Sequence, residues 1–265
     1  MQSVAAITVT DDFHNKIILP APAQRIIILA PHFRATLTQL GSTSKINGEL
    51  NTAAYTPTVS IGNMGGLDLE KILRLKPDLI LAWGNLFIKQ LSFLQQHGIA
   101  VYYANPTSLL NISKNHVDIG RLVGKCSLAK QQARQFLTDL SSLKRTFQQR
   151  KKLSVFFQIS DHPMYTVNAD TWINDAIQLC NATNIFAKAQ FSSFPTTYES
   201  VIALKPDIII GEINAENRSI WHQITSIGTM QHLAIYTLAG DSLAQPSLTI
   251  LSDIKKLCET IHQKF

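Results

Sequence analysis

His32 is a candidate metal ligand, because it follows Pro31 at the end of an apolar run, where a strand gives way to a turn. A neutral imidazole can coordinate iron or cobalt. No second ligand accompanies His32 at metal-site spacing, so the competing interpretation is a loop histidine that hydrogen-bonds a polar ligand group or faces water. Asp161 and His162 are a second candidate pair, expected to line a ligand cleft; the alternative is that they lie in an ordinary surface loop. We expect no dedicated zinc site.

The motifs of common enzyme classes do not occur in this sequence. It has no Gly-rich phosphate loop, no Gly-x-Ser-x-Gly nucleophile turn and no paired carboxylates on a predicted helix face. We therefore predict no catalytic residues and no hydrolase activity.

Glu70 and Glu199 occupy equivalent places in a phrase that occurs twice. Residues 68–81 read DLEKILRLKPDLIL, and residues 197–210 read TYESVIALKPDIII. Each copy predicts a short helix, a Lys-Pro-Asp break and a covered strand, because proline cannot continue the helix and β-branched residues suit a strand. The separation of the copies is about one small domain, which predicts two pseudo-equivalent lobes. Either glutamate can also be a helix N-terminal acid favoured by the helix dipole.

The elements around these residues alternate as expected of α/β lobes with mostly parallel sheets. Ile7 to Leu19 predicts a hairpin that ends at Pro20. Gly41 ends the first predicted helix, at residues 33–40. The further predicted elements of the first lobe are a strand at 25–30, a helix at 33–40, a strand at 78–83, a helix at 87–97 and a strand at 98–103.

Residues 127–150 predict one long helix, since they contain no Gly or Pro and place apolar side chains at helical spacing. Such a helix is long enough to connect two lobes as a stiff strut, which implies only a small closure on ligand binding. We predict an N-terminal α/β lobe at 1–125, an interlobe helix at 126–150 and a C-terminal α/β lobe at 151–265. The second lobe is expected to contain a strand at 153–159, a helix at 172–181 and a final helix at 248–263.

The composition is that of a globular protein with a basic surface. Hydrophobic residues make up 45% and charged residues 16%, the net charge is +6, and no apolar run reaches the length that spans a bilayer. The positive residues are scattered apart from the run Arg150-Lys151-Lys152, and no nucleic-acid reader motif accompanies them. We expect a solvated basic surface and no nucleic-acid partner. Residues 1–6 lack the features of a secretion signal, so a signal was either removed or never present.

The three cysteines are too few for a disulfide scaffold and lack metal-finger spacing. Cys180 and Cys258 lie on predicted amphipathic helices of the second half. They form either a disulfide or two buried thiols, and Cys126 is the odd thiol in the first case.

Several motifs together resemble substrate-binding proteins of bacterial ABC importers for metal chelates, the group whose two lobes are joined by a single helix. The resemblance covers nearly the whole chain. The matching features are the entry hairpin from Ile7 to Pro20, QRIIILAP at 24–31, the two glutamate phrases, LAW at 81–83, FQ at 157–158, LCN at 179–181 leading to NIF at 184–186, FP at 194–195 and KLC at 256–258.

The resemblance implies a fold, a location and a partner. The fold is α/β, with two Rossmann-like lobes joined by one long helix (class III periplasmic binding protein). Glu70 and Glu199 are expected to form ion pairs with arginines of the importer's permease dimer, and charge complementarity suits such a transient complex. The resemblance also favours a Cys180–Cys258 disulfide, a periplasmic location and a monomer that is not an enzyme.

A ligand cleft is expected where the loops after the strands meet at the lobe boundary. Flat aromatic faces suit a corrin or porphyrin ring. For Trp83 the alternative is core packing, and either Tyr55 or Tyr165 can be an axial phenolate to haem iron. The expected ligand-binding residues are His32, Phe33, Tyr55, Asn63, Met64, Trp83, Tyr165, Phe194, Asp241 and Gln245.

The resemblance implies cobalamin or another corrinoid as the transported ligand, and no resident cofactor. Relatives of the vitamin-binding type have tryptophan where this chain has Met64 and Phe194, and arginine near Gln245, so haem is the second candidate. A ferric siderophore suits the pocket less, because Arg34 is the only arginine expected in the cleft. The alternative from another class is a tetrapyrrole metal chelatase, which requires a carboxylate beside His32.

Overall fold

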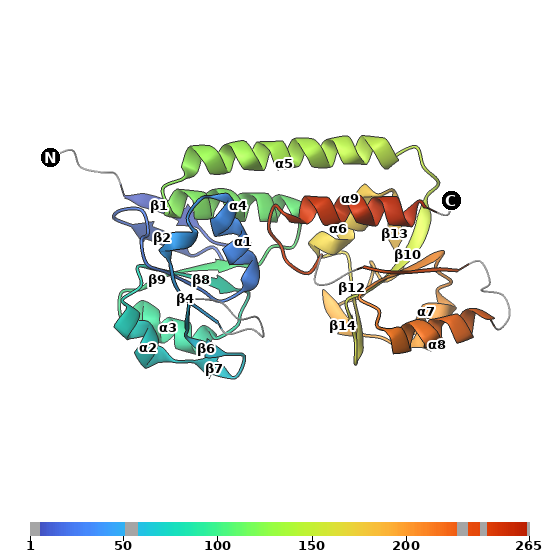
Figure 1. Ribbon diagram of the computed structural model, residues 1–265, viewed down its shortest axis with the longest axis horizontal. Helices are drawn as coiled ribbons and strands as arrows, with labels where there is room; N and C mark the ends of the chain where they lie inside the picture. The colour runs from blue at the N-terminus through green and yellow to red at the C-terminus, as the bar shows by residue number, and fades with distance from the viewer. Residues whose placement is uncertain (1–5, 51–57, 227–232, 239–242, 264–265) are drawn as a thin grey trace. The chain divides into compact units, whose positions relative to one another are not determined.

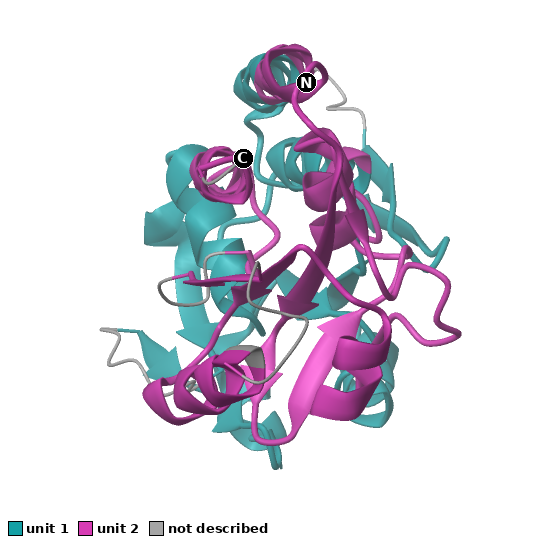
Figure 2. Cartoon of the chain, turned by 90° about the vertical axis from the view of Figure 1, so that its right-hand side faces the viewer, with its two compact units in different colours: residues 1–106, 111–135 teal, residues 107–110, 136–265 magenta. Residues whose placement is uncertain are grey.

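The computed structural model describes residues 6–50, 58–226, 233–238 and 243–263 (Figure 1). Two compact units divide the chain (Figure 2). Unit 1 comprises residues 1–106 and 111–135, and unit 2 comprises residues 107–110 and 136–265. The division falls inside the long helix α5 (Cys126–Phe147), so this one helix belongs partly to each unit. Among the described residues, none of the helices combines the length and the apolar character needed to cross a bilayer.

A five-stranded parallel sheet with the order β5-β4-β3-β8-β9 forms the centre of unit 1. The predicted hairpin is confirmed as the antiparallel pair β1 and β2, and a second small hairpin, β6 and β7, precedes the first repeat. The strands are β1 (Ile7–Thr10), β2 (Lys16–Leu19), β3 (Ile26–Ile28), β4 (Ile46–Glu49), β5 (Val59–Ser60), β6 (Gly62–Asn63), β7 (Gly66–Leu67), β8 (Leu79–Trp83) and β9 (Ala100–Ala104).

Helices cover both faces of this sheet (Figure 1). One face packs against α1 (Pro31–Gln39) and α4 (Leu109–Leu122), and the other packs against α2 (Leu69–Leu75) and α3 (Ile88–Gln96). The alternation along β3 explains the two cores, because Ile26 and Ile28 point to one face and Ile27 to the other. A 3₁₀ turn at Thr43–Lys45 connects α1 to β4.

Helix α4 was not predicted from the sequence. Its Asn, Ser and Gly residues have low helix propensity, but Ile112, Ile119 and Leu122 repeat at helical spacing and are buried, so packing overrides propensity. Gly120 is required there, since a Cβ atom at this position would lie 2.2 Å from the Cβ of Ala129 at the start of α5.

Unit 2 contains a four-stranded parallel sheet with the order β13-β10-β15-β16 and a three-stranded antiparallel sheet with the order β11-β12-β14. The predicted strand at 153–159 and helix at 172–181 are confirmed to within two residues. The strands are β10 (Leu153–Gln158), β11 (Ser160–Asp161), β12 (Met164–Val167), β13 (Ala182–Asn184), β14 (Ser193–Pro195), β15 (Ile208–Gly211) and β16 (Ala234–Thr237).

Four further helices lie in the described part of unit 2. Helices α7 (Tyr198–Ala203) and α8 (Ala215–Ser226) cover one face of the parallel sheet, where Trp221 packs on Phe156. Helix α6 (Trp172–Leu179) packs against α9 (Ile250–Ile261), the predicted final helix.

The two copies of the repeated phrase have the same backbone structure. Asp68 and Thr197 cap α2 and α7 by accepting hydrogen bonds from the third backbone N–H that follows. Lys76 and Lys205 both take left-handed backbone conformations, with φ of 49° and 47°. The next aspartate of each copy then accepts hydrogen bonds at the start of a neighbouring strand, in β10 of unit 2 and just before β3 of unit 1. The repeat is therefore a helix-turn-strand unit, as the sequence predicts.

Candidate functional site

His32 lies at the carboxyl edge of the unit 1 sheet, but in a different setting from the one predicted. Helix α1 begins at Pro31 rather than at residue 33, so His32 is a helical residue and is only 5% exposed. Its ring lies against Phe33 and Trp83, with ring centroids 4.1 and 4.3 Å away. Burial in this aromatic environment lowers the pKa of His32 to about 3, because the charged imidazolium would lose its hydration. The imidazole is therefore neutral at any physiological pH.

The Nε2 atom of His32 is buried and has no hydrogen-bond partner among the described residues. Buried polar atoms are nearly always paired, and an unpaired one costs roughly 1–3 kcal/mol. No carboxylate bonds the ring, so the arrangement that the chelatase interpretation requires is not seen in the described part of the chain.

Phe33 and Trp83, both expected to contact ligand, differ in exposure. Phe33 is 1% exposed and belongs to the hydrophobic core of unit 1, so its position is that of a core residue. Trp83 is the last residue of β8 and is partly exposed, with one side packed on the same core. Gly84 follows with φ of 51° and turns the chain directly after Trp83. Trp83 thus presents an aromatic surface at the strand end, where ligand sites of α/β sheets form.

Arg34, the one arginine expected in the cleft, is engaged in an ion pair within unit 1. Its Nη2 and Nε atoms donate to Glu49 Oε2 at 2.8 and 3.1 Å, and the Thr58 hydroxyl also donates to Glu49. The positive charge of Arg34 is thereby largely neutralised by a buried carboxylate. This leaves little charge for an anionic ligand.

Asn63 and Met64 lie at the tip of the β6–β7 hairpin. The Asn63 side chain accepts a hydrogen bond from the Gly65 N–H at 2.8 Å, which shapes the turn. Met64 is 63% exposed. The Gln90 side chain bonds both the N–H and the C=O of Leu67 and so fixes the hairpin to α3. Met64 is therefore an exposed apolar side chain on a well-held turn.

Tyr165 and Phe194 lie on adjacent strands of unit 2 but not on one face. Tyr165 of β12 is paired with Pro195, and Thr166 is paired with Phe194 of β14. Directly paired residues share a face and successive residues alternate, so the two aromatic side chains point to opposite faces of this small sheet. Phe194 packs edge-on against Phe186, with centroids 5.6 Å apart. A ligand on one face would contact one of the two rings, not both.

A buried polar network at the carboxyl end of β10 joins the candidate Asp161 to residues that the sequence analysis did not single out. Gln158 is 0% exposed; its Nε2 donates to Asp161 Oδ1 at 2.6 Å, and its Oε1 accepts from Trp221 Nε1 at 3.3 Å. Asp161 also accepts from Asn217 Nδ2 at 2.6 Å, and the Tyr198 hydroxyl donates to the same Asn217. Asp161 is therefore fixed within unit 2, and His162 is exposed, 3.7 Å from Glu216.

The Asn-x-x-Asn spacing at 214–217 was a usable signal for part of this network. The Asn214 side chain caps α8 by accepting a hydrogen bond from the Asn217 N–H at 2.8 Å. Gly211 allows the end of β15 to approach β10, since a Cβ atom there would lie 1.9 Å from the carbonyl oxygen of Gln158.

Three further predicted positions complete the list. Gln245 is described and partly exposed, and its carbonyl accepts from the Ser247 N–H at 2.9 Å. Tyr55 and Asp241 lie outside the described residues. The described residues contain no group of three or more His, Cys, Asp and Glu side chains that could hold a metal ion.

The two repeat glutamates are both exposed, and their surroundings differ. Glu70 forms an ion pair with Arg74 one helical turn later, at 2.5 Å. Glu199 has no ion-pair partner among the described residues, and the backbone N–H of Glu199 and the Thr197 hydroxyl hold its pKa below the usual value. The carboxylate of Glu199 is thus the more available of the two.

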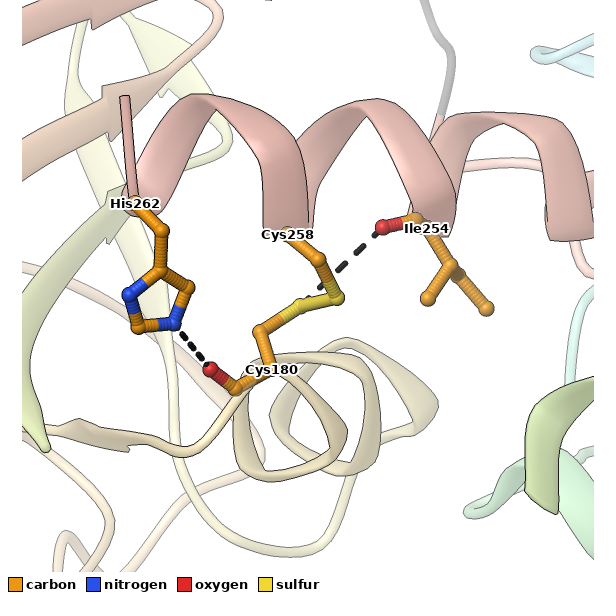
Figure 3. Close-up of a disulfide and its surroundings, with 4 residues drawn as sticks. All are labelled: Cys180, Ile254, Cys258 and His262. Atoms are coloured by element: carbon orange, nitrogen blue, oxygen red, sulfur yellow. Dashed lines mark hydrogen bonds between the residues drawn. A yellow bond between two sulfur atoms is a disulfide. The ribbon is translucent and has the colours of Figure 1, made fainter. Parts of the chain in front are cut away.

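The Cys180–Cys258 disulfide is confirmed (Figure 3). It joins the end of α6 to α9, and both cysteines are fully buried. His262 Nε2 donates to the Cys180 carbonyl at 2.6 Å, beside the disulfide, and its ring stacks on Phe147 of α5. Cys126, at the start of α5, is a free thiol of intermediate exposure.

A model of the family described as periplasmic binding protein matches residues 39–226, which is most of the chain. The chain belongs to this family. The vitamin B12-binding protein of Vibrio campbellii is 30% identical over 254 residues, which cover 92% of each chain. The crystal structure of the periplasmic vitamin B12-binding protein of Vibrio cholerae matches with a TM-score of 0.80 and 25% identity, covering 92% of this chain and 99% of that one.

A more distant structure supports the fold alone. The periplasmic haem-binding protein from Roseiflexus sp. RS-1 matches with a TM-score of 0.74 at 18% identity, over 91% of this chain and 99% of that one. The predicted fold class is confirmed: two α/β units with mostly parallel sheets, joined by one long helix. Family and relatives are substrate-binding transport proteins rather than enzymes, and they imply a periplasmic location.

Proposed function

We propose that this protein captures cobalamin or another corrinoid in the periplasm and delivers it to an ABC importer. The observation that supports this most is the likeness to vitamin B12-binding proteins across 92% of both chains, which includes the strand ends where ligands bind in such folds. The proposal inherits its ligand class from those relatives.

Trp83 is the residue of unit 1 best placed to contact a corrin ring. It is partly exposed at the end of β8, and the buried His32 and the core hold it from one side. A rigid aromatic face gives a large contact area at a small cost in side-chain entropy, which suits a broad flat ligand. The exposed Met64 can add adaptable apolar contact.

A ferric siderophore is a poorer ligand for this chain. Anionic chelates are best bound by arginine forks, and the guanidinium of Arg34 is already paired with Glu49 at 2.8 Å. A large amphipathic tetrapyrrole is the better match to these side chains.

For delivery, we propose that Glu70 and Glu199 form ion pairs with basic residues of the permease. Both glutamates lie in the first turn of a short helix and are exposed to solvent. Exposed charges of this kind steer and orient an encounter more than they tighten it, as delivery followed by release requires.

Calorimetry of the purified protein tests the ligand. We expect one-to-one binding of aquocobalamin, and at least about a tenfold loss of affinity for Trp83→Ala, because an aromatic face is removed. Phe93→Ala removes a partly exposed aromatic ring on α3 and serves as the matched control, with unchanged affinity. Binding of haem without binding of aquocobalamin would transfer the assignment to haem.

A further inference from the structure

Unit 2 has a strongly basic region at the end of α5 and in the segment that follows. Between residues 140 and 160 the chain contains Lys144, Arg145, Arg150, Lys151 and Lys152 and no aspartate or glutamate. All five side chains are exposed. The sequence alone gave no reason to treat this run as more than a solvated surface.

The structure places the run at the amino-terminal edge of the unit 2 sheet and brings another cation to the same edge. Lys152 directly precedes β10, and Lys205 lies just before β15, the neighbouring strand. The Asp207 N–H donates to the Ser154 carbonyl at 2.9 Å, so these two strand starts are adjacent. We call Lys144, Arg145, Arg150, Lys151, Lys152 and Lys205 the basic edge.

The backbone under the basic edge is held in place. The Asn181 side chain donates to the Arg150 carbonyl at 2.7 Å, and Leu153, the first residue of β10, is buried. Asp207 also lies at these strand starts, and its carboxylate accepts from the Ser154 N–H and hydroxyl, both at 2.7 Å. Leu204, 47% exposed, adds an apolar side chain beside Lys205.

We propose that the basic edge binds the anionic phospholipid surface of a membrane that borders the periplasm. Clusters of four to eight Lys and Arg residues bind acidic lipid headgroups by charge alone and need no pocket, because the headgroups are laterally mobile. An exposed leucine among the cations suits the interfacial region of a bilayer. Nucleic acid fits less well, since the basic edge offers no aromatic side chain for base stacking.

The basic edge lies opposite Glu199 within unit 2. The first residue of α7, Tyr198, donates to Asn217, which lies in α8 just after β15 and so at the carboxyl edge of the sheet, whereas the basic edge lies at the amino edge. One orientation of unit 2 therefore presents cations to lipid, and the reverse orientation presents Glu199. Lipid-bound and permease-docked molecules are then separate populations; this consequence rests on the docking role proposed for Glu199, whereas lipid binding itself does not.

Vesicle co-sedimentation of the full chain at physiological salt tests the proposal. We expect binding to phosphatidylcholine vesicles that contain phosphatidylglycerol and none to phosphatidylcholine alone. The triple variant Arg150→Gln, Lys151→Gln and Lys152→Gln should bind roughly 100-fold more weakly, at about one factor of five per cation removed. The matched control neutralises three scattered exposed lysines, Lys16→Gln, Lys89→Gln and Lys188→Gln, and should retain most of the binding.

Equal losses in the two triple variants would overturn the proposal, because they would show that net charge alone attracts the lipid. Tighter binding to a single-stranded oligonucleotide than to the anionic vesicles, lost in the same basic-edge variant, would assign the surface to a different polyanion. Glu199→Gln should leave vesicle binding unchanged, so that a failure of docking and a failure of lipid binding are distinguishable. A urea-unfolding midpoint equal to that of the wild type in both triple variants shows that they are folded.

Discussion

The ends of two pseudo-equivalent strands, β3 in unit 1 and β10 in unit 2, differ in how their polar groups are satisfied. Each strand lies beside the strand that ends a copy of the repeat, β8 in unit 1 and β15 in unit 2. After β3, the buried His32 leaves Nε2 without a partner among the described residues. At the end of β10, Gln158 is bonded to Asp161, the Glu212 carbonyl and Trp221.

This difference indicates that the carboxyl edges of the two sheets differ in rigidity. A fully bonded buried network is rigid and specifies one arrangement, so the carboxyl edge of unit 2 is fixed without ligand. The unpaired Nε2 of the buried His32 is costly, and a ligand or a rearrangement beside the partly exposed Trp83 could complete its bonding. Unit 1 therefore has the edge that a ligand would change more.

The largest difference in stability between the repeats is expected on removing the aspartate after Lys-Pro, Asp78 in unit 1 and Asp207 in unit 2. Each of these aspartates bonds the start of a neighbouring strand. Asp207 accepts from Ser154 in a half-buried setting, and Asp78 accepts from Gln24 and Arg25 N–H groups that are near solvent. Asp207→Ala should lower the free energy of unfolding by about 3 kcal/mol and Asp78→Ala by about 1 kcal/mol, because water can replace only the exposed acceptor. Urea denaturation measures both values, and equal losses would show that the repeats are energetically equivalent.

A second difference between the units is the dependence of stability on pH that the buried His32 gives to unit 1. The pKa of His32 is lowered to about 3, so the folded protein binds no proton there at pH 5, whereas the unfolded chain, with its ordinary pKa near 6.5, does. The contribution of His32 to stability then rises with pH up to about 6.5 and is flat above, and it falls by about 2 kcal/mol between pH 7 and pH 5.

Unfolding of the wild type and of His32→Phe at both pH values isolates this effect, because the variant keeps an aromatic ring and loses the titration. Its free energy of unfolding should fall by about 2 kcal/mol less between pH 7 and pH 5. The idea fails if the free energy of unfolding of His32→Phe falls as much between pH 7 and pH 5 as that of the wild type.

Much of the fold could be predicted because its signals are local. The entry hairpin, the long helix and both repeat units follow from residue type and spacing over a dozen or so positions. Helix α4 could not, since it consists of weak helix formers and depends on packing against α5 through Gly120. The start of α1 was missed because Pro31 was interpreted as a break, although proline is also favoured in the first helical turn.

The candidate site was harder to predict than the fold, because its contacts join residues that are distant in sequence. Asp161 and Asn217, or Arg34 and Glu49, carry no sequence signal of their pairing. The opposite faces of Tyr165 and Phe194 follow from strand register, which periodicity alone does not give. Position after a strand correctly placed Trp83 at an edge, but it could not tell that neighbouring Phe33 belongs to the core.

The smallest effect is expected for docking to the permease, where Glu70 and Glu199 should contribute unequally. Arg74 partly neutralises Glu70, and unit 2 has Ala203 at the equivalent place, so Glu199 should contribute more to docking. With the cognate importer in liposomes at low salt, Glu199→Gln should weaken stimulation of ATP hydrolysis by about fivefold and Glu70→Gln by about twofold. Glu259→Gln, on α9 and paired with Lys255, is the control and should have no effect.

Exchanging the neighbours, with Arg74→Ala and Ala203→Arg in one chain, should reverse the order of the two glutamates, because a cation one turn after Glu199 would then compete with the permease for its carboxylate. If the order stayed the same after the exchange, the asymmetry would come from the permease and not from this protein.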